Sequence, residues 1–152
     1  MPRTCKLSLA LFLALALLPL WGGAALAGAK ADIIAGNAAA QAGKLKQAIR
    51  LYTRALKSGK LSRTNQAVAY SNRGSAWDDL GRADRAIQDF NQAIQADPSY
   101  APAYYNRSFA YEKKGLLKLA LEDMKKALDL EPDDLDYRQR VRYLEYRLSK
   151  TR

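Results

Sequence analysis

The sequence predicts an all-α protein: a solenoid of about three helix-turn-helix repeats, closed by a C-terminal helix. Residues 67–100 and 101–134 align without a gap at an offset of 34 residues. A repeat of this length, with apolar residues at helical spacing, is typical of solenoids in which each unit packs on the next. The matched positions are Tyr70, Gly74, Trp77, Gly81, Ala86, Phe90, Ala93 and Pro98, which correspond to Tyr104, Ser108, Tyr111, Gly115, Ala120, Met124, Ala127 and Pro132.

The N-terminal segment, residues 1–27, is interpreted as a secretory signal. A basic start precedes an uncharged, leucine-rich stretch, and small residues two apart end at Ala27, where cleavage is expected. The alternative is an uncleaved membrane anchor, because residues 7–29 carry no charge. Pro19 and two glycines favour cleavage. We therefore expect an exported protein, periplasmic or secreted, with membrane anchoring as the alternative.

Residues 28–62 are predicted to form a degenerate first unit. An offset of 38 residues aligns Gly36 with Gly74 and places a tyrosine and alanines at the expected positions. The four additional residues are assigned to a loop at 63–66, in a stretch rich in Gly, Ser, Thr and Asn. Terminal repeats often match least well.

Each unit is predicted to contain two helices. In the second unit, apolar and small residues recur at spacings of four and three over residues 67–80, and the pattern resumes over 84–96. Gly81 separates the two helices, and Pro98 ends the second. We expect Trp77 and Phe90 to fill the space between neighbouring helices.

Residues 135–152 are predicted to form a capping helix and a short tail. Asp133 or Asp134 can cap the start of this helix. One face is apolar and the other is charged, as the end of a solenoid requires for solubility. The apolar face carries Tyr137, Val141, Leu144 and Leu148, and the charged face carries Arg138, Arg140, Arg142 and Arg147.

On these residues the chain resembles the tetratricopeptide-repeat (TPR) family. The resemblance covers residues 29–134 and implies helix pairs stacked in a right-handed superhelix, with the first helix of each pair lining a concave groove. Most members of the family bind peptides or partner proteins in that groove. One departure is that Arg73 and Arg107 stand where the family commonly has leucine. We expect both arginines to bury their stems and keep their charged heads in water.

The helical period places a second set of residues opposite the packing stripe of each first helix. We expect these residues to form the groove and to hold an extended or short helical segment of a partner protein. A primary amide both donates and accepts, so asparagines can bind a peptide backbone. We expect Asn72 and Asn106 to be neighbours. The predicted groove residues are Asn37, Asn72, Asn106, Tyr105, Phe109 and Ile33.

Two alternatives remain for this groove. The asparagines could bond only to the neighbouring helix, and the aromatic residues could pack against the last helix. Some family members grip the C-terminal carboxylate of heat-shock chaperones with lysine, asparagine and arginine. Here the basic positions of that clamp fall on Ile33, Pro102 and Asn106. The resemblance therefore implies that this particular grip is absent.

The basic residues form a second candidate surface. The net charge is +10, and residues 29–66 carry eight basic residues against one acidic residue. Such surfaces could hold an anionic envelope component, such as lipid headgroups or acidic polysaccharide, or could be solvated outer faces. Nucleic acid is disfavoured by the predicted export. The basic surface residues are Lys46, Arg50, Arg54 and Lys57 near one end, with Arg138 and Arg142 near the other.

No enzyme activity is expected. The chain has no histidine, and its single cysteine, Cys5, precedes the predicted cleavage site. Soft metal sites, histidine bases and thiol nucleophiles are therefore excluded from the mature chain. The acidic residues at 129–134 lack the spacing of a calcium-binding EF-hand. We expect no cofactor, no metal and no small-molecule substrate, and the function is predicted to be protein binding or, as a third possibility, self-assembly.

Overall fold

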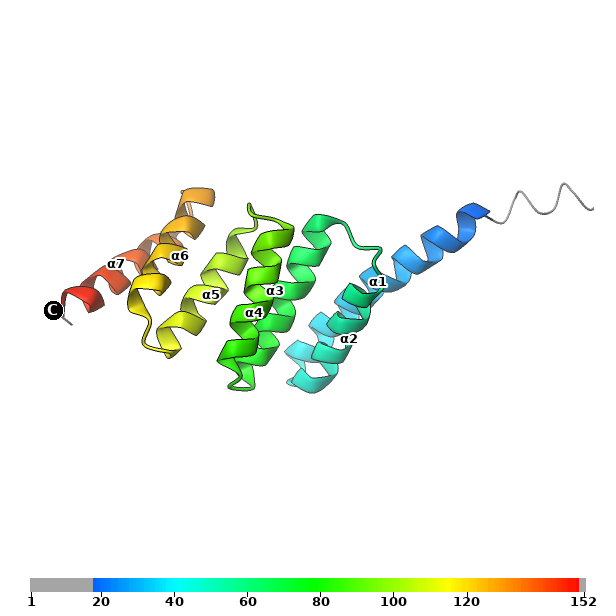
Figure 1. The fold of residues 1–152 in the computed structure, drawn as a ribbon, viewed down its shortest axis with the longest axis horizontal. Helices are drawn as coiled ribbons and strands as arrows, with labels where there is room; N and C mark the ends of the chain where they lie inside the picture. Colours follow the sequence, from blue (N-terminus) through cyan, green and yellow to red (C-terminus); the bar gives the residue numbers. More distant parts are fainter. Residues whose placement is uncertain (1–17, 151–152) are drawn as a thin grey trace, which may run out of the picture.

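The computed structural model describes residues 18–150, with side chains from residue 28 onward, and this part of the chain is entirely helical and loop (Figure 1). Helices α1/α2, α3/α4 and α5/α6 form three hairpins that stack side by side, and α7 packs on the last. The predicted all-α solenoid is confirmed. The helices are α1 (Leu18–Gln41), α2 (Leu45–Lys57), α3 (Arg63–Asp79), α4 (Ala83–Ala96), α5 (Ala101–Lys113), α6 (Leu117–Leu130) and α7 (Leu135–Ser149).

The proposed signal segment is only partly described. Residues 1–17 lie outside the described residues, and the expected cleavage point after Ala27 falls within α1. No helix in the described part of the chain is long and apolar enough to cross a bilayer.

Glycine closes the turn inside each hairpin. Gly81 has a φ of +71°, a left-handed conformation that glycine adopts without steric cost. Its N–H donates to the carbonyl of Asp78 (2.8 Å), and the N–H of Arg82 donates to that of Trp77 (2.8 Å). This pair of bonds satisfies the last carbonyls of α3 and ends the helix. The same arrangement recurs at Gly43 and Gly115.

The connection between the first and second hairpins is shorter than expected. Residues 63–66, assigned to a loop above, form the first turn of α3 instead. The side chain of Ser62 accepts a hydrogen bond from the N–H of Asn65 (3.2 Å), which caps the helix at that point. The loop is therefore confined to residues 58–62.

Small residues let the two helices of a hairpin approach closely. Ala86 is fully buried, and Phe90 is 1% exposed beneath Gly74. A Cβ atom added to Gly74 would lie 2.7 Å from the ring of Phe90, so the crossing has no room for a side chain. In the third hairpin Ser108 and Met124 occupy the equivalent positions, and both are buried. The flexible side chain of methionine adapts to irregular space.

The capping helix forms as predicted. The side chain of Asp134 accepts a hydrogen bond from the N–H of Tyr137 (2.9 Å) at the start of α7. Tyr137, Val141 and Leu144 are buried in one cluster with residues of α5 and α6, and Leu148 packs against that cluster. The last hairpin thus has its apolar face covered.

Candidate functional site

The first helix of each hairpin and α7 together form one face of the molecule, which we call the odd-helix face. Polar contacts cross this face between neighbouring helices, and four of them join residues 35 apart with the donor on the later helix. The repeated spacing of 35 residues fixes the register between neighbours. These contacts are Asn72 to Asn37 (2.9 Å), Asn106 to Ser71 (3.2 Å), Lys113 to Asp78 (2.6 Å) and Arg147 to Glu112 (2.7 Å).

Asn37 and Asn72 lie together between α1 and α3. The side-chain oxygen of Asn37 accepts hydrogen bonds from the Tyr52 hydroxyl (2.8 Å) and from Nδ2 of Asn72 (2.9 Å). Burial raises the pKa of Tyr52, which keeps that hydroxyl protonated as a donor. These bonds orient both amides, so Nδ2 of Asn37 and Oδ1 of Asn72 are left without a partner among the described residues.

A cavity of about 220 Å³ opens at these two asparagines. Its lining includes amide, hydroxyl and carboxylate side chains from α1 and α3, two alanines, and Tyr52 from α2. No cation lines it. The lining residues are Asn37, Ala40, Gln41, Tyr52, Asn72, Ser75, Ala76 and Asp79.

Asn106 does not join this pair. Its Nδ2 donates to Oγ of Ser71 (3.2 Å), one residue before Asn72. The expected Asn72–Asn106 neighbourhood assumed a spacing of 34 residues, whereas the contacts across this face follow 35. That drift of one residue turns Asn106 toward Ser71, which is fully buried.

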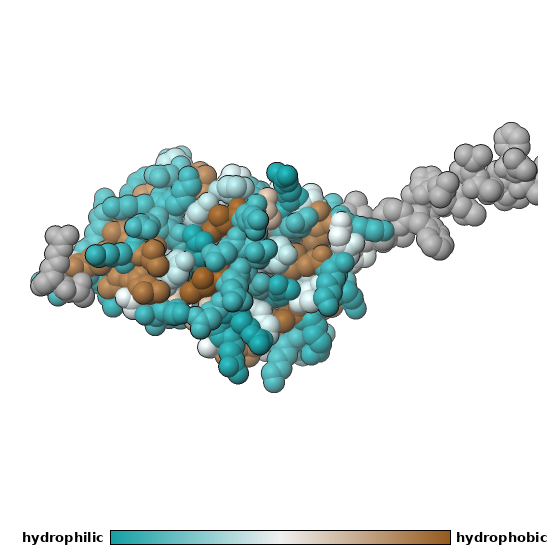
Figure 2. Space-filling model, viewed as in Figure 1, coloured by the Kyte–Doolittle hydropathy of each residue, from teal (hydrophilic) through white to brown (hydrophobic). Residues whose placement is uncertain are grey.

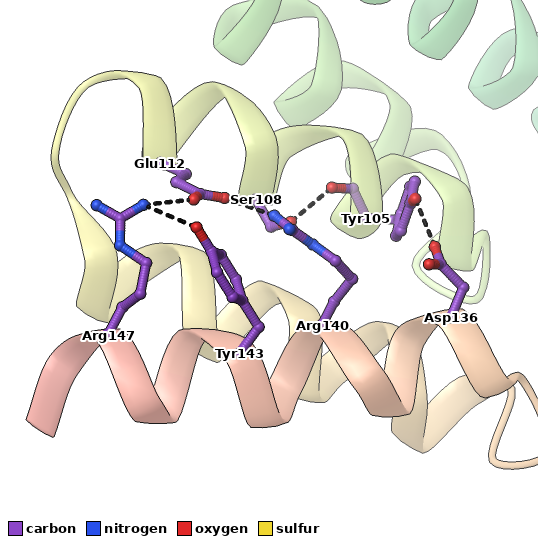
Figure 3. Close-up of polar contacts among 7 residues, drawn as sticks. All are labelled: Tyr105, Ser108, Glu112, Asp136, Arg140, Tyr143 and Arg147. Carbon is purple, nitrogen blue, oxygen red and sulfur yellow. Dashed lines mark hydrogen bonds and ion pairs between the residues drawn. The ribbon is translucent and has the colours of Figure 1, made fainter.

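Tyr105 faces α7 rather than an open groove (Figure 3). Its hydroxyl donates to Oδ2 of Asp136 (2.6 Å), and its ring lies 5.0 Å from that of Tyr137 and 4.9 Å from that of Phe109. Burial, together with the neighbouring Asp136 carboxylate, raises the pKa of Tyr105 to about 12. The packing alternative described above is therefore the arrangement found.

Phe109 and Glu112 are also covered by side chains of α7. The guanidinium of Arg140 lies 4.3 Å from the centre of the Phe109 ring. Arg140 also lies 2.5 Å from Oε2 of Glu112, and Arg147 contacts Oε1 of the same carboxylate at 2.7 Å (Figure 3). Arg140 and Arg147 were assigned above to the solvated face of the cap. Both arginines turn inward because they pair with the same carboxylate, Glu112 on α5. Their spacing of seven residues, two helical turns, places them on one face of α7 and could have indicated a shared partner.

Ile33 is not a groove residue. It is 7% exposed and packs in the core with Ala29 and Ala48, while the next residue, Ile34, is 69% exposed. One residue corresponds to about 100° of rotation around a helix, so a small error in the helical phase interchanges a core and a surface position. Among residues 28–41 of α1, the exposed large apolar side chain is that of Ile34.

Arg73 and Arg107 place their charged heads in ion pairs, not in water. Arg73 donates two hydrogen bonds to Asp89, both at 2.7 Å, and a third to Thr53 (3.0 Å) on the preceding hairpin. Hydrogen bonding to Asp89 raises the pKa of Arg73. Arg107 repeats the arrangement with Asp123 and Asn91. Each arginine therefore joins three helices, which a leucine could not do by hydrogen bonding.

The predicted basic surface divides into groups with different surroundings. Arg54 pairs with Asp32 on α1, and Arg138 donates to the carbonyl of Pro132 (2.7 Å). Lys57 and Arg142 are exposed. Lys46 and Arg50 border a cavity beside Trp77. Four of the six residues lie on α2 and the other two on α7.

No group of three or more His, Cys, Asp or Glu side chains among residues 18–150 is arranged to hold a metal ion.

Comparison with known proteins identifies the fold family. Family models for the TPR repeat and the tetratricopeptide repeat match residues 79–115 and 101–134. The second TPR of Spaghetti (RPAP3), bound to the HSP90 peptide SRMEEVD, is 30% identical, with a TM-score of 0.62 over 68% of this chain and 92% of that chain. The chain belongs to the tetratricopeptide-repeat family.

Other solved TPR domains are similarly close. The first TPR of Spaghetti (RPAP3), bound to the same HSP90 peptide, is 28% identical, with a TM-score of 0.73 over 80% of this chain and 94% of that chain. The Arabidopsis OM64 TPR domain is 29% identical, with a TM-score of 0.73 over 84% of this chain and 99% of that chain. No curated protein matched the sequence. The TPR fold of these relatives is a protein-interaction scaffold.

Proposed function

We propose that this TPR protein binds an extended segment of a partner protein on the α1–α3 part of the odd-helix face. The observation that carries the proposal is the pair of oriented amides at Asn37 and Asn72. One amide retains a free donor and the other a free acceptor, at the edge of a 220 Å³ cavity. A peptide backbone offers the complementary C=O and N–H groups. The peptide complexes of the relatives support a ligand of this kind.

The chemistry of the cavity selects against a terminal carboxylate as the main contact. Asp79 lines the cavity, and its negative charge would repel a ligand carboxylate. The basic positions of the chaperone clamp are occupied by Ile33, Pro102 and Asn106, none of which is charged. The proposed ligand is therefore an internal, largely neutral segment that is held through its backbone.

The test is a peptide selection on the immobilised full chain, followed by affinity measurements on the selected peptides. Asn72→Ala removes the free acceptor, and we expect about a tenfold loss of affinity, the effect of one hydrogen bond left unmade. Asn106→Ala is the matched control, because the same chemistry is removed outside the cavity. Circular dichroism verifies that both variants are folded.

Equal losses in the two variants would contradict groove recognition at the asparagine pair. If no variant changes affinity but added salt releases the peptides from all of them, binding occurs through the basic surfaces. That result would favour the alternative function, peripheral binding of an anionic envelope component.

We also propose that residues 1–27 direct export and are removed. The basic start, the apolar stretch and the small residues ending at Ala27 support this. Mass spectrometry of the protein purified from its native cells should find Gly28 as the N-terminal residue. An N-terminus at Met1 in a membrane fraction would support the anchor alternative.

A further inference from the structure

A larger cavity, of about 470 Å³, lies away from the odd-helix face, and we call it the Trp77 pocket. It opens between the start of α2 and the α3–α4 turn, at the lower edge of the molecule in Figure 1. None of its residues lines the cavity at Asn37 and Asn72. The lining residues are Lys46, Ile49, Arg50, Trp77, Leu80, Arg82 and Arg85.

The floor of the Trp77 pocket is apolar and recessed. Ile49 is 8% exposed, and Trp77 and Leu80 are half-buried. The guanidinium of Arg85 lies 4.7 Å from the centre of the Trp77 ring and covers one side of it. Apolar surface is thus accessible to a group that enters the pocket. This apolar surface lies inside the recess and does not project from the protein.

The rim of the Trp77 pocket carries uncompensated positive charge. Lys46, Arg50 and Arg82 are exposed and make no side-chain hydrogen bond or ion pair with any residue that the structure describes. The carboxylate of Asp84, two residues after Arg82, is paired with Lys114 on the following hairpin. Figure 2 shows hydrophilic side chains projecting from this lower edge. With Arg85 on the indole, four cations surround an apolar recess.

We propose that the Trp77 pocket binds an acidic peptide segment that carries one large apolar side chain. The cations attract the acidic residues, and the apolar side chain enters the recess over Trp77. A bilayer fits less well, because stable insertion needs apolar side chains that project beyond the charges. A free anion would leave the apolar floor unused. The protein would then hold two partner segments on different surfaces.

Trp77 itself can report the binding. The chain has two tryptophans, so the full-length chain carrying Trp21→Phe has Trp77 as its sole tryptophan. The probe is a peptide of about ten Glu and Asp residues with one central leucine, and matched peptides replace the leucine by alanine or the acids by lysine. We expect the acidic leucine peptide to change Trp77 emission in a saturable way. Replacing its leucine or its acids should weaken binding about tenfold or more.

Substitution of the rim locates the site. Arg50→Gln/Arg82→Gln should weaken the acidic leucine peptide about tenfold, because both residues are exposed cations at the pocket. Lys118→Gln/Lys126→Gln removes the same charge from exposed positions on α6 and should leave affinity within about twofold. All these side chains are exposed, so thermal unfolding should be unchanged in both variants.

Four results would overturn the proposal. Equal weakening by the two double variants places the peptide elsewhere. Equal binding of the alanine peptide indicates a simple anion site. A response of Trp77 to phosphatidylglycerol vesicles but not to the peptide indicates a lipid surface. A concentration-dependent emission change without peptide, with self-association in sedimentation, indicates that a second copy fills the pocket.

Discussion

The two ends of the odd-helix face use similar residues in different ways. Between α1 and α3, Asn37 and Asn72 bond to each other and leave polar groups at an open cavity. On α5, Asn106 bonds to a buried serine, and Tyr105 and Phe109 lie under α7. The availability of a repeat position for binding is therefore decided by the helices that pack beside it.

The capping helix explains the difference. Besides its apolar stripe, α7 brings Arg140 and Arg147 onto Glu112 and Asp136 onto Tyr105, so polar and aromatic groups of α5 are satisfied within the chain. No helix precedes α1 in the described part of the chain, and the contacts at α1 and α3 remain incomplete. This difference supports the proposed binding at the N-terminal half of the face.

Of the substitutions that test this difference between the two ends, one that weakens the packing of α7 should reduce stability most. Leu144 is fully buried, and Leu144→Ala should lower the free energy of unfolding by about 3 kcal/mol through lost burial and the cavity that remains. Urea denaturation followed by circular dichroism measures this loss. Tyr146→Ala, at a site 62% exposed on the same helix, is the control and should change stability by less than about 0.5 kcal/mol. Similar losses in both variants would mean that α7 is not docked through Leu144.

The second and third hairpins use different residue pairs where their two helices cross. Exchanging these side chains tests whether the large Phe90 ring is the reason that glycine is needed at position 74. Gly74→Ser would bring a Cβ within 2.7 Å of the Phe90 ring and should destabilise the chain by about 1–3 kcal/mol. Adding Phe90→Met reproduces the Ser108–Met124 pair of the third hairpin and should restore part of that loss. Thermal unfolding of the single and double variants measures the loss caused by Gly74→Ser and the part that Phe90→Met restores. A double variant no more stable than Gly74→Ser alone would refute this packing explanation.

Local patterns were sufficient for much of the fold. The repeat spacing, the helix break at Gly81 and a cap by Asp133 or Asp134 were predicted from neighbours in sequence. The structure places a left-handed glycine at that break and the cap at Asp134. The start of α3 was misplaced, because a composition typical of loops concealed a helix cap at Ser62.

The site depended on details that a sequence pattern does not resolve. Ile33 and Ile34 differ by one helical step, and the register of 35 residues that brings Asn106 to Ser71 arises only when helices are stacked. The inward turn of Arg140 likewise requires Glu112 on another helix. The buried pairing of Arg73 follows from Asp89, 16 residues later, and the recurrence of this pair at Arg107 was a readable signal.

Alkaline pH should destabilise the covered end of the odd-helix face. The pKa of Tyr105 is raised from 10 to about 12 in the folded chain, so the neutral hydroxyl is favoured by folding. This contribution is complete below pH 10 and is lost as the pH rises toward 12. Tyr105→Phe should therefore reduce the fall in melting temperature between pH 9.5 and about 11.5. Tyr146→Phe is the exposed control, and an identical pH dependence in both variants would contradict the burial of Tyr105 under α7.

The smallest effect on stability is expected at the open end of the face. Asn72 donates one hydrogen bond to Asn37 from a half-exposed position, and Asn72→Ala should cost about 0.5–1.5 kcal/mol. Asn37→Ala should cost more, because it leaves the buried hydroxyl of Tyr52 without its acceptor. Urea denaturation of the two variants gives both values. If Asn72→Ala were the more destabilising, Asn72 would be a structural residue of the solenoid. The pair of amides would then no longer distinguish this end of the face from the end covered by α7.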